Sequence, residues 1–301
     1  MTDLPLDHVR TLLAAVDEGT FEAAARALHV TPSAISQRIK ALEQRTGRVL
    51  LVRSKPVQLT ESGVAVVRFA RQLAALERDA AAELGLPGGD EPVTLSIAVN
   101  ADSLATWFLS ALASVPAQLR ICYELHREDQ DYTDQLLRQG LVMAAVSSSP
   151  QPVQGCIVRK LGRMRYRAMA TREFADRWLS QAPLRQAISS APVVIFNRRD
   201  DLQDKFLRRL GPRVTSGPRH YVPASEAFFE AVASGFGWGM LPDIQVTERG
   251  AADLVEIAPD LPVDVPLHWQ QWKLGSPALT AVGDAVIETA ARLLSQTGKN
   301  D

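Results

Sequence analysis

The sequence predicts two parts of different fold class, an all-α N-terminal part and an α/β C-terminal part. Apolar residues recur at helical spacing as far as residue 84, which is typical of packed helices. From residue 93 onward, short strand-like runs alternate with helical patterns, and this order is typical of α/β layers. Residues 86–92 read Leu-Pro-Gly-Gly-Asp-Glu-Pro, so we expect a hinge between the two parts.

Residues 20–42 predict two short helices joined by a tight turn. Apolar residues follow helical spacing on one side of each, with Phe21, Ala24, Ala25 and Leu28 in the first helix and Ile35, Ile39 and Leu42 in the second. The second helix is expected to have Thr31 as its N-cap and Pro32 in its first position, because both residue types favour those places. Another amphipathic helix over residues 6–16 would complete a three-helix core.

The outer face of the second predicted helix is polar and cationic. Serine and glutamine hydrogen-bond base edges, and arginine and lysine bind phosphates or guanine. Between residues 26 and 55 the chain has seven Lys or Arg residues against one acidic residue, Glu43, which supplies attraction to phosphates. This pattern indicates a helix-turn-helix that reads DNA; the alternative is an amphipathic helical hairpin with no DNA role. The candidate DNA-contact residues are Thr31, Pro32, Ser33, Ser36, Gln37, Arg38, Lys40, Arg53 and Lys55.

Residues 49–59 predict a short basic hairpin, since two apolar runs flank Ser54-Lys55-Pro56. Such a wing would bring Arg53 and Lys55 to the DNA backbone or minor groove. Thr60 is the predicted N-cap of a helix that extends to about residue 84 and has an apolar stripe. A helix of this length needs a partner, and the same helix of a second subunit is the simplest one; packing against its own domain is the alternative.

The composition excludes several classes of protein. The 301 residues have a net charge of −1 and 22% charged residues, which is typical of a soluble globular protein. Two cysteines and five dispersed histidines lack metal-ligand spacing, and the chain has no nucleophile–base constellation or glycine-rich phosphate loop. We therefore expect no enzyme, cofactor or metal, and no membrane span, because no apolar run is long enough. The expected location is the cytoplasm, in association with the nucleoid.

The C-terminal part is predicted to alternate strands and helices throughout. Strands are expected at about 93–99, 119–125, 142–146, 166–170, 193–196, 219–222, 237–241, 254–257 and 267–273. Helices are expected at about 103–113, 131–138, 173–181, 200–210, 225–234, 243–248 and 276–296. Because such alternation is typical of βαβ units, we expect largely parallel sheets.

Motifs along the whole chain resemble those of the LysR-type transcriptional regulators. They comprise residues 21–28 (Phe-Glu-Ala-Ala-Ala-Arg-Ala-Leu), 31–36, 39–43, 59–63 and 237–242. The arginine- and lysine-responsive branch, which includes a lysine-export regulator, is the most similar through residues 99–108 (Val-Asn-Ala-Asp-Ser-Leu-Ala-Thr-Trp-Phe), 191–194 and 225–228. His29 replaces the small residue often found in the family's turn, and histidine tolerates a positive φ. Met143 stands where many members have an acidic residue.

The resemblance implies a domain organisation. It predicts a winged helix-turn-helix DNA-binding domain over 1–59, a linker (dimerisation) helix over 60–85, a hinge at 86–92 and a two-lobed, periplasmic-binding-protein-like effector domain over 93–301. Lobe I would comprise about 93–165 and 267–301, and lobe II about 166–266.

The resemblance also implies partners. These are double-stranded promoter DNA, a second subunit bound through the linker helix, a homotetramer formed through the effector domains, and RNA polymerase as a further candidate. The implied function is activation of a basic-amino-acid exporter gene when lysine, arginine or histidine binds in the cleft of the effector domain.

The effector pocket is expected beyond the carboxyl ends of the strands, where ligands of open α/β sheets bind. Candidates near these places are Asn100, Asp102, Ser103, Thr106, Glu128, Asp129, Ser147, Asn197, Ser225 and Glu226, and Trp269, on a crossover strand, is a candidate wall of the cleft. A helix N-terminus suits a carboxylate, and the acidic residues suit amines. Structural roles are the alternatives: helix caps for Asn100, Asp102 and Ser225, a solvated loop for Glu128 and Asp129, a polar strand end for Ser147, and the core for Trp269.

Two functions fit the sequence. In the first, an effector changes the orientation of lobes and subunits, and so the placement of two winged domains on DNA. In the second, the protein has an architectural role: it binds the replication origin or the nucleoid and bends DNA without an effector. DNA footprints with and without amino acids distinguish the two.

Overall fold

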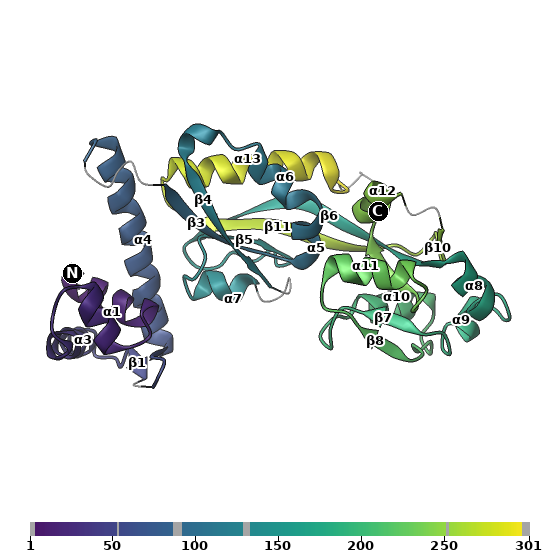
Figure 1. Ribbon diagram of the computed structural model, residues 1–301, viewed down its shortest axis with the longest axis horizontal. Helices are drawn as coiled ribbons and strands as arrows, with labels where there is room; N and C mark the ends of the chain where they lie inside the picture. Colours follow the sequence, from purple (N-terminus) through teal and green to yellow (C-terminus); the bar gives the residue numbers. More distant parts are fainter. Residues whose placement is uncertain (1–3, 53, 87–91, 129–132, 251–252, 297–301) are drawn as a thin grey trace.

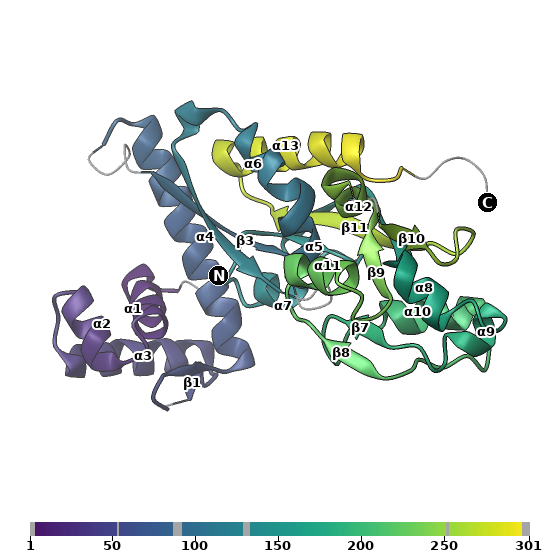
Figure 2. The same cartoon turned by 45° about the vertical axis from the view of Figure 1, so that its right-hand side comes forward.

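The computed structural model describes residues 4–52, 54–86, 92–128, 133–250 and 253–296 (Figure 1). A helical N-terminal domain is joined through one long helix, α4 (Glu61–Glu83), to an elongated α/β domain. In the rotated view of Figure 2, α4 extends along the part of the α/β domain that contains β3 and α7. In the described residues, no helix is both long enough and apolar enough to cross a membrane.

The N-terminal domain packs α1 (Leu6–Asp17), α2 (Phe21–Ala27) and α3 (Pro32–Thr46) with the first half of α4 around one core. The predicted apolar face of α3 is buried, with Ile35, Ile39 and Leu42 at most 1% exposed. As predicted, Thr31 is the N-cap of α3, and its Oγ1 accepts a hydrogen bond from the Ala34 backbone N–H at 3.2 Å. The turn before α3 places His29 at φ +54°, a left-handed conformation that histidine tolerates.

A two-stranded wing follows α3. Strands β1 (Leu51–Val52) and β2 (Gln58–Leu59) pair in antiparallel fashion, as the hairpin pattern predicts. Thr60 then caps α4, since its Oγ1 accepts the Gly63 N–H at 3.1 Å. Gly63 fits this position because an added Cβ would lie 2.0 Å from the Leu50 carbonyl oxygen. Helix α4 has 23 residues and is therefore about 35 Å long.

The α/β domain is built on one seven-stranded sheet. Its strands run in the order β10-β6-β11-β5-β3-β4, with β9 paired to β6 off this path. The strand bounds are β3 Val93–Val99, β4 Ile121–Arg127, β5 Ala144–Ser147, β6 Cys156–Thr171, β9 Gly239–Pro242, β10 Leu254–Glu256 and β11 Val263–Trp272. A second, parallel pair consists of β7 (Val193–Ile195) and β8 (Arg219–Tyr221).

Two long antiparallel strands, β6 and β11, connect the two ends of this domain (Figure 1). We call the end with β3, β4, β5 and α13 (Pro277–Leu293) lobe I, and the end with β7–β10 lobe II. The remaining helices of lobe I are α5 Ala101–Ser103, the π-helical turn Leu104–Phe108, α6 Leu109–Ala113, the 3₁₀ turn Ala117–Leu119 and α7 Thr133–Arg138. Those of lobe II are α8 Arg172–Trp178, α9 Leu184–Ala187, α10 Leu202–Leu210, α11 Ser225–Ala233 and α12 Asp243–Arg249.

The prediction of largely parallel sheets is wrong for the seven-stranded sheet. Strand β3 is parallel to β4 and β5, but β11 is antiparallel to β5 and β6, and β6 is antiparallel to β9 and β10. The difference arises because β6 begins at Cys156, ten residues before the predicted strand, and β11 begins at Val263, four residues early. Each therefore crosses from one lobe to the other and pairs in both.

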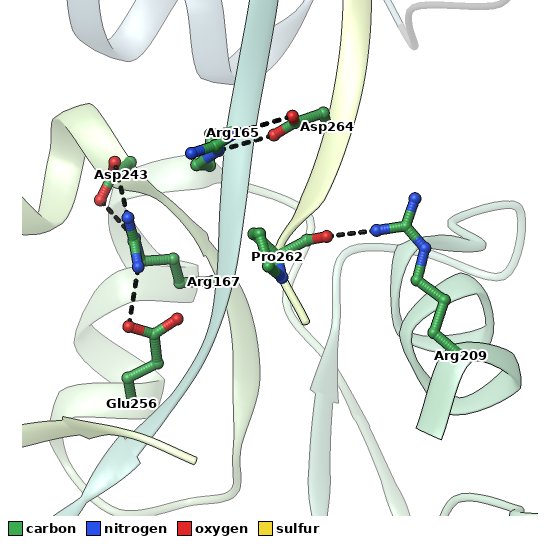
Figure 3. A network of polar contacts seen from close by, with 7 residues as sticks. All are labelled: Arg165, Arg167, Arg209, Asp243, Glu256, Pro262 and Asp264. Atoms are coloured by element: carbon green, nitrogen blue, oxygen red, sulfur yellow. Dashed lines mark hydrogen bonds and ion pairs between the residues drawn. The ribbon is translucent and has the colours of Figure 1, made fainter. Parts of the chain in front are cut away.

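Ion pairs fix the middle of β6 within lobe II (Figure 3). Arg165 binds Asp264 on β11 through two hydrogen bonds of 2.8 and 2.9 Å. Arg167 binds Asp243 on α12 at 2.7 Å and Glu256 on β10 at 2.9 Å. Tyr166 lies between these two arginines in the sequence. Because side chains alternate along a strand, Tyr166 points to the opposite face of β6. The ion pairs therefore hold β6 in the register that directs Tyr166 between the lobes.

Candidate functional site

Helix α3 presents the side chains that the sequence assigns to DNA contact. Ser33, Gln37 and Lys40 are exposed on the side opposite the buried Ile35 and Ile39. Thr31 and Pro32 are also exposed. Ser36 and Arg38 are half-buried, and the Arg38 guanidinium donates a 3.4 Å hydrogen bond to Thr11 Oγ1 on α1. Helix α3 therefore has a polar surface of the kind that enters a DNA groove.

The wing lies beside α3 and is attached to it by Glu43. Glu43 Oε1 accepts the Leu50 backbone N–H at 2.9 Å, so the one acidic residue of the basic segment has a structural role. Lys55 lies at the tip of the hairpin and is exposed. Arg53 lies outside the described residues.

A cavity of about 100 Å³ opens between the two lobes. Its lining comes from the ends of β3 and β4, from β6, and from the loops that lead into α10 and α11. The lining residues are Asn100, Ala101, Asp102, Glu128, Tyr166, Phe196, Asn197, Arg199, Asp200, Asp201, Leu202, Ser225, Phe228, Met240, Pro242 and Gln245. The position at the carboxyl ends of β3 and β7 is the one that the topology rule predicts.

Asp102 joins the two lobes across this cavity. Its Oδ1 accepts a hydrogen bond from Ser225 Oγ on α11 at 2.6 Å, and its Oδ2 accepts one from the Tyr166 hydroxyl on β6 at 2.7 Å. Burial raises the pKa of Asp102, the two hydrogen bonds oppose that shift, and the negative charge of Glu226 adds to it. Burial and the adjacent Asp102 together raise the pKa of Tyr166 well above its ordinary value. Tyr166 is therefore a neutral hydrogen-bond donor.

A second carboxylate, Asp200, faces the cavity from lobe II. It accepts the backbone N–H groups of Phe196 at 3.1 Å and Leu202 at 3.0 Å. Burial raises its pKa, these backbone hydrogen bonds lower it, and the negative charge of Asp102 raises it further. Two carboxyl groups from opposite lobes thus lie in one desolvated cavity, where a cation favours the ionised form of both.

Two buried amide oxygens in the same lining have no hydrogen-bond partner in the described part of the chain. They are Asn100 Oδ1 at the end of β3 and Gln245 Oε1 on α12. Buried polar atoms are almost always hydrogen-bonded, so both oxygens are suited to a donor supplied by a ligand. The cavity therefore offers two carboxylates and two amide acceptors to a molecule rich in N–H groups.

Five of the predicted effector residues line this cavity: Asn100, Asp102, Glu128, Asn197 and Ser225. Asp129 lies outside the described residues. The other five lie elsewhere: Ser103, Thr106, Ser147, Glu226 and Trp269 are absent from the lining. Glu226 is exposed, near enough to Asp102 to influence its pKa.

Local hydrogen bonds and packing explain the positions outside the lining. Thr106 Oγ1 donates to the Asp102 carbonyl at 2.6 Å, and Ser147 Oγ accepts the Ser149 N–H at 3.0 Å. Ser103 is fully buried. Trp269 is fully buried as well, contacts Phe108 and donates its indole N–H to Gln271 at 2.6 Å. Trp269 therefore belongs to the core, which was the alternative role given for it above.

Sequence reasoning missed Tyr166, Asp200 and Gln245. Tyr166 lies inside a long strand whose first half is charged, so its place between the lobes depends on the crossing of β6. The sequence did contain a signal for Asp200, because this residue lies in the polar run Asn-Arg-Arg-Asp-Asp (197–201), which begins two residues after β7. Gln245 lies on α12, which has no such signal. No cluster of three or more potential metal ligands occurs among the residues that the structure describes.

Comparison with known proteins gives matches to both parts of the chain. Residues 6–64 match the family model described as "Bacterial regulatory helix-turn-helix protein, lysR family", and residues 88–291 match "LysR substrate binding domain". The lysine export transcriptional regulatory protein LysG of Corynebacterium glutamicum is 40% identical over 291 residues, which cover 96% of this chain and 98% of the relative.

Solved structures include two that are similar over almost their whole length. The crystal structure of ArgP from Mycobacterium tuberculosis has a TM-score of 0.90 and 42% identity, covering 96% of this chain and 98% of that one. Full-length LysG from Corynebacterium glutamicum with bound effector Arg has a TM-score of 0.82 and 38% identity, covering 97% and 99%.

Proposed function

Because the chain belongs to the LysR family of bacterial transcriptional regulators, we propose that it senses a basic amino acid in the cavity between its lobes. Lysine, arginine and histidine are the proposed effectors, and occupancy of the cavity changes how the winged domains bind promoter DNA. The family consists of regulators and not of enzymes, so the cavity is assigned to binding without turnover.

The observation that carries the proposal is the excess of hydrogen-bond acceptors in the cavity. Asp102 and Asp200 are desolvated carboxyl groups, and Asn100 Oδ1 and Gln245 Oε1 are buried acceptors without a partner in the described residues. A ligand with an α-ammonium and a side-chain ammonium or guanidinium supplies both cations and the missing donors. The Corynebacterium glutamicum LysG structure with bound effector Arg supports this choice of ligand class.

Asp102 is proposed to bind one cationic group and Asp200 the other. A cation at Asp102 competes with the hydroxyls of Ser225 and Tyr166 for the carboxylate oxygens, so binding alters a contact between lobes. Glu128 and Asn197 lie at the same cavity from lobe I and lobe II and are proposed as further contacts. A ligand shifts a conformational equilibrium only through such differential interactions.

DNA recognition is proposed for the exposed face of α3 and the wing. Ser33, Ser36, Gln37 and Arg38 would contact base edges, and Lys40, Arg53 and Lys55 would contact phosphates. Thr31 and Pro32, at the N-terminus of α3, would place its first turn against the backbone.

A homodimer is proposed through the free side of α4. Val66 and Ala70 lie in the core of the N-terminal domain, whereas Phe69, Leu76 and Leu84 are 41%, 46% and 72% exposed. An apolar stripe of this kind on a long helix is buried by the same helix of a second subunit. A tetramer formed through the effector domains is proposed from the family alone.

The proposed target is a promoter beside a gene for export of a basic amino acid, which the protein would activate, with RNA polymerase as a further partner. The name of the Corynebacterium glutamicum relative, a lysine export regulator, supports this target.

Calorimetric titration of the full chain with lysine, arginine, histidine and citrulline tests the effector class. Citrulline has the length of arginine without its side-chain charge, so it is the matched control. We expect saturable binding of at least one basic amino acid and none of citrulline at the same concentration. Absence of binding by all three basic amino acids would overturn the effector assignment. A DNA footprint unchanged by every amino acid would favour the architectural function.

A further inference from the structure

Arg71, in the middle of α4, contacts both domains at once. Its Nη2 donates a hydrogen bond to Asp17 Oδ1 at the end of α1 at 2.7 Å, and its Nη1 donates to the Gly140 carbonyl of lobe I at 2.9 Å. The Arg71 side chain is 20% exposed, so water screens these contacts only partly. One guanidinium therefore connects the N-terminal domain, the linker helix and the effector domain.

Gly140 allows lobe I to approach the helix at this point. Its φ is +66°, and an added Cβ would lie 2.8 Å from both Cα and Cβ of Arg68 on α4. A side chain at position 140 would therefore strain the backbone and collide with the linker helix. The contact between α4 and lobe I depends on a residue without a side chain.

On the N-terminal side, the contact is rigidly attached to the DNA-binding domain. Val67 and Ala70, which precede Arg71, are buried in the core that includes Ile35 and Ile39 of α3. A second ion pair, between Arg10 on α1 and Glu77 on α4, lies farther along the helix. A movement of lobe I against Arg71 is therefore a movement against the whole winged domain.

On the effector side, the contact lies at the end of α7. This helix begins five residues after Glu128, which lines the cavity. It is anchored to the sheet because Leu137 is fully buried and Gln270 Nε2 on β11 donates to Asp134 Oδ1 at 3.3 Å. The Gly140 N–H then bonds the Leu137 carbonyl at 3.1 Å and ends the helix. Helix α7 and the contact at its end are thus fixed to the sheet of lobe I, in which β4 ends directly before Glu128 at the cavity.

Next to this contact, a cavity of about 800 Å³ lies between α4 and lobe I. Its lining includes Arg71 and Gly140 themselves, Arg78 and Ala81 of α4, and Thr94, Ser96 and Met143 of lobe I. The two surfaces therefore meet at a small contact beside a wide groove, not over a packed interface.

We propose that Arg71 and Gly140 form the joint through which the effector cavity sets the position of the winged domain within one subunit. The joint holds the arrangement described above, and effector binding changes the fraction of molecules in which it is made. Arg71 is a positioning residue and touches neither effector nor DNA. The link to an effector rests on the proposed function, but the mechanical role of the joint does not.

The test uses the full chain with Arg71→Met, which removes both hydrogen bonds, and Gly140→Ala, which adds the colliding Cβ. Arg78→Met is the matched control, because Arg78 lies on the same helix, lines the groove and forms no hydrogen bond or ion pair with the residues that the structure describes. Spin labels at Glu22→Cys and Leu293→Cys, in a Cys122→Ser background, report the distance between the domains. Dilution with unlabelled protein restricts the signal to one subunit of an oligomer.

Without ligand, wild type and Arg78→Met should give one narrow distance distribution, and Arg71→Met and Gly140→Ala should give broader ones. With arginine or lysine, the distance should shift in wild type but not in the two joint variants. The ratio of DNA affinities with and without effector, typically about 5- to 150-fold in coupled systems, should fall toward 1 in both variants. Both should still bind the effector saturably, with an affinity altered by no more than the coupling that was lost.

Distance distributions and affinity ratios of Arg71→Met and Gly140→Ala equal to those of wild type would overturn the proposal. Failure of every basic amino acid to bind wild type would instead overturn the proposed function. The comparison of wild type with Arg71→Met in the absence of ligand would still decide whether the joint positions the winged domain.

Discussion

Asp102 of lobe I and Ser225 of lobe II share a hydrogen bond of 2.6 Å between Oδ1 and Oγ. Each lies at the start of a helix that follows a strand or loop of its own lobe. The bond crosses the cavity that the two lobes form, and the same carboxylate accepts the Tyr166 hydroxyl. A ligand that binds Asp102 must replace or rearrange these contacts. Ligand binding is therefore coupled to the arrangement of the two lobes.

Substitution Asp102→Asn should weaken effector binding while it preserves the fold. The amide keeps the shape of the side chain and can still accept from Ser225, but it loses the charge that attracts a cation. Hydrogen bonds to charged groups are worth about 1.5–3 kcal/mol, so affinity should fall by roughly 10- to 150-fold. Calorimetric titration with arginine or lysine measures the loss.

Glu226→Gln is the matched control, because Glu226 is exposed and absent from the cavity lining. Its effect should stay below about 1 kcal/mol, as for exposed charge pairs. Equal losses in the two variants would show that Asp102 acts through general electrostatics and not as a ligand contact.

Effector binding should release protons in weakly acidic solution. Burial raises the pKa of Asp102 and Asp200 above the ordinary 3.8 in the empty cavity, and a bound cation lowers both again. Affinity should therefore rise with pH up to the raised pKa values of the empty cavity and be level above them. Titrations in buffers with different ionisation enthalpies measure the protons released, and Asp102→Asn should release fewer. The same number released by both proteins would contradict this explanation.

The raised pKa of Asp102 should also affect the stability of the protein without ligand, which should decrease as the pH rises and the carboxyl ionises. A carboxyl whose pKa is raised on folding stabilises the native state below its unfolded pKa, and this contribution is lost as pH rises through the folded pKa. Asp102→Asn should therefore unfold at a temperature equal to or above that of wild type at neutral pH. A clearly lower melting temperature would mean that the carboxylate is needed for folding.

Gln37→Ala and Lys40→Ala should separate base recognition from phosphate contact. Both side chains are exposed on α3. Loss of a base contact should cost about 1–3 kcal/mol on the operator with little effect on random DNA, whereas loss of a phosphate contact should weaken both and lower the salt dependence by about one ion. Fluorescence anisotropy over a salt series distinguishes them. Loss of effector affinity in either variant would contradict the separation of the two sites.

Gly63→Ala should destabilise the N-terminal domain. An added Cβ would lie 2.0 Å from the Leu50 carbonyl oxygen, and such overpacking costs about 1–3 kcal/mol. Gly275→Ala is the control, since nothing lies within 4 Å of its added Cβ. Urea unfolding monitored by circular dichroism measures both, and equal midpoints would contradict the packing described for the start of α4.

Local patterns were sufficient to predict the N-terminal domain. Thr31, Pro32 and the apolar spacing of Ile35, Ile39 and Leu42 act within one helix, so sequence alone predicted the cap and the buried face. The LysR resemblance and its arginine- and lysine-responsive branch are confirmed by the matches over both domains. The course of β6 and β11 was missed because their pairing is long-range, and Gly162 and several charged residues interrupt the strand pattern of β6.

The candidate cavity was predicted in part for the same reason. Asn100 and Asp102 follow a strand and Ser225 begins a helix, and the topology rule predicts ligand binding at such positions. Tyr166 and Gln245 reach the cavity only because β6 crosses between lobes and α12 packs behind it. Ser147 satisfies the same positional rule and Trp269 lies within the crossing strand β11, but both side chains are buried in the core, where each forms a local hydrogen bond.

The central claim is that a cation bound at Asp102 changes how the protein binds DNA. Its most direct test is the affinity of the 301-residue chain for promoter DNA, measured with arginine, lysine, histidine or citrulline, in wild type and in Asp102→Asn. We predict a change in wild type with at least one basic amino acid, no change with citrulline, and a change abolished in Asp102→Asn at the same effector concentration. Promoter affinity that stays constant in wild type with all three basic amino acids would contradict the claim.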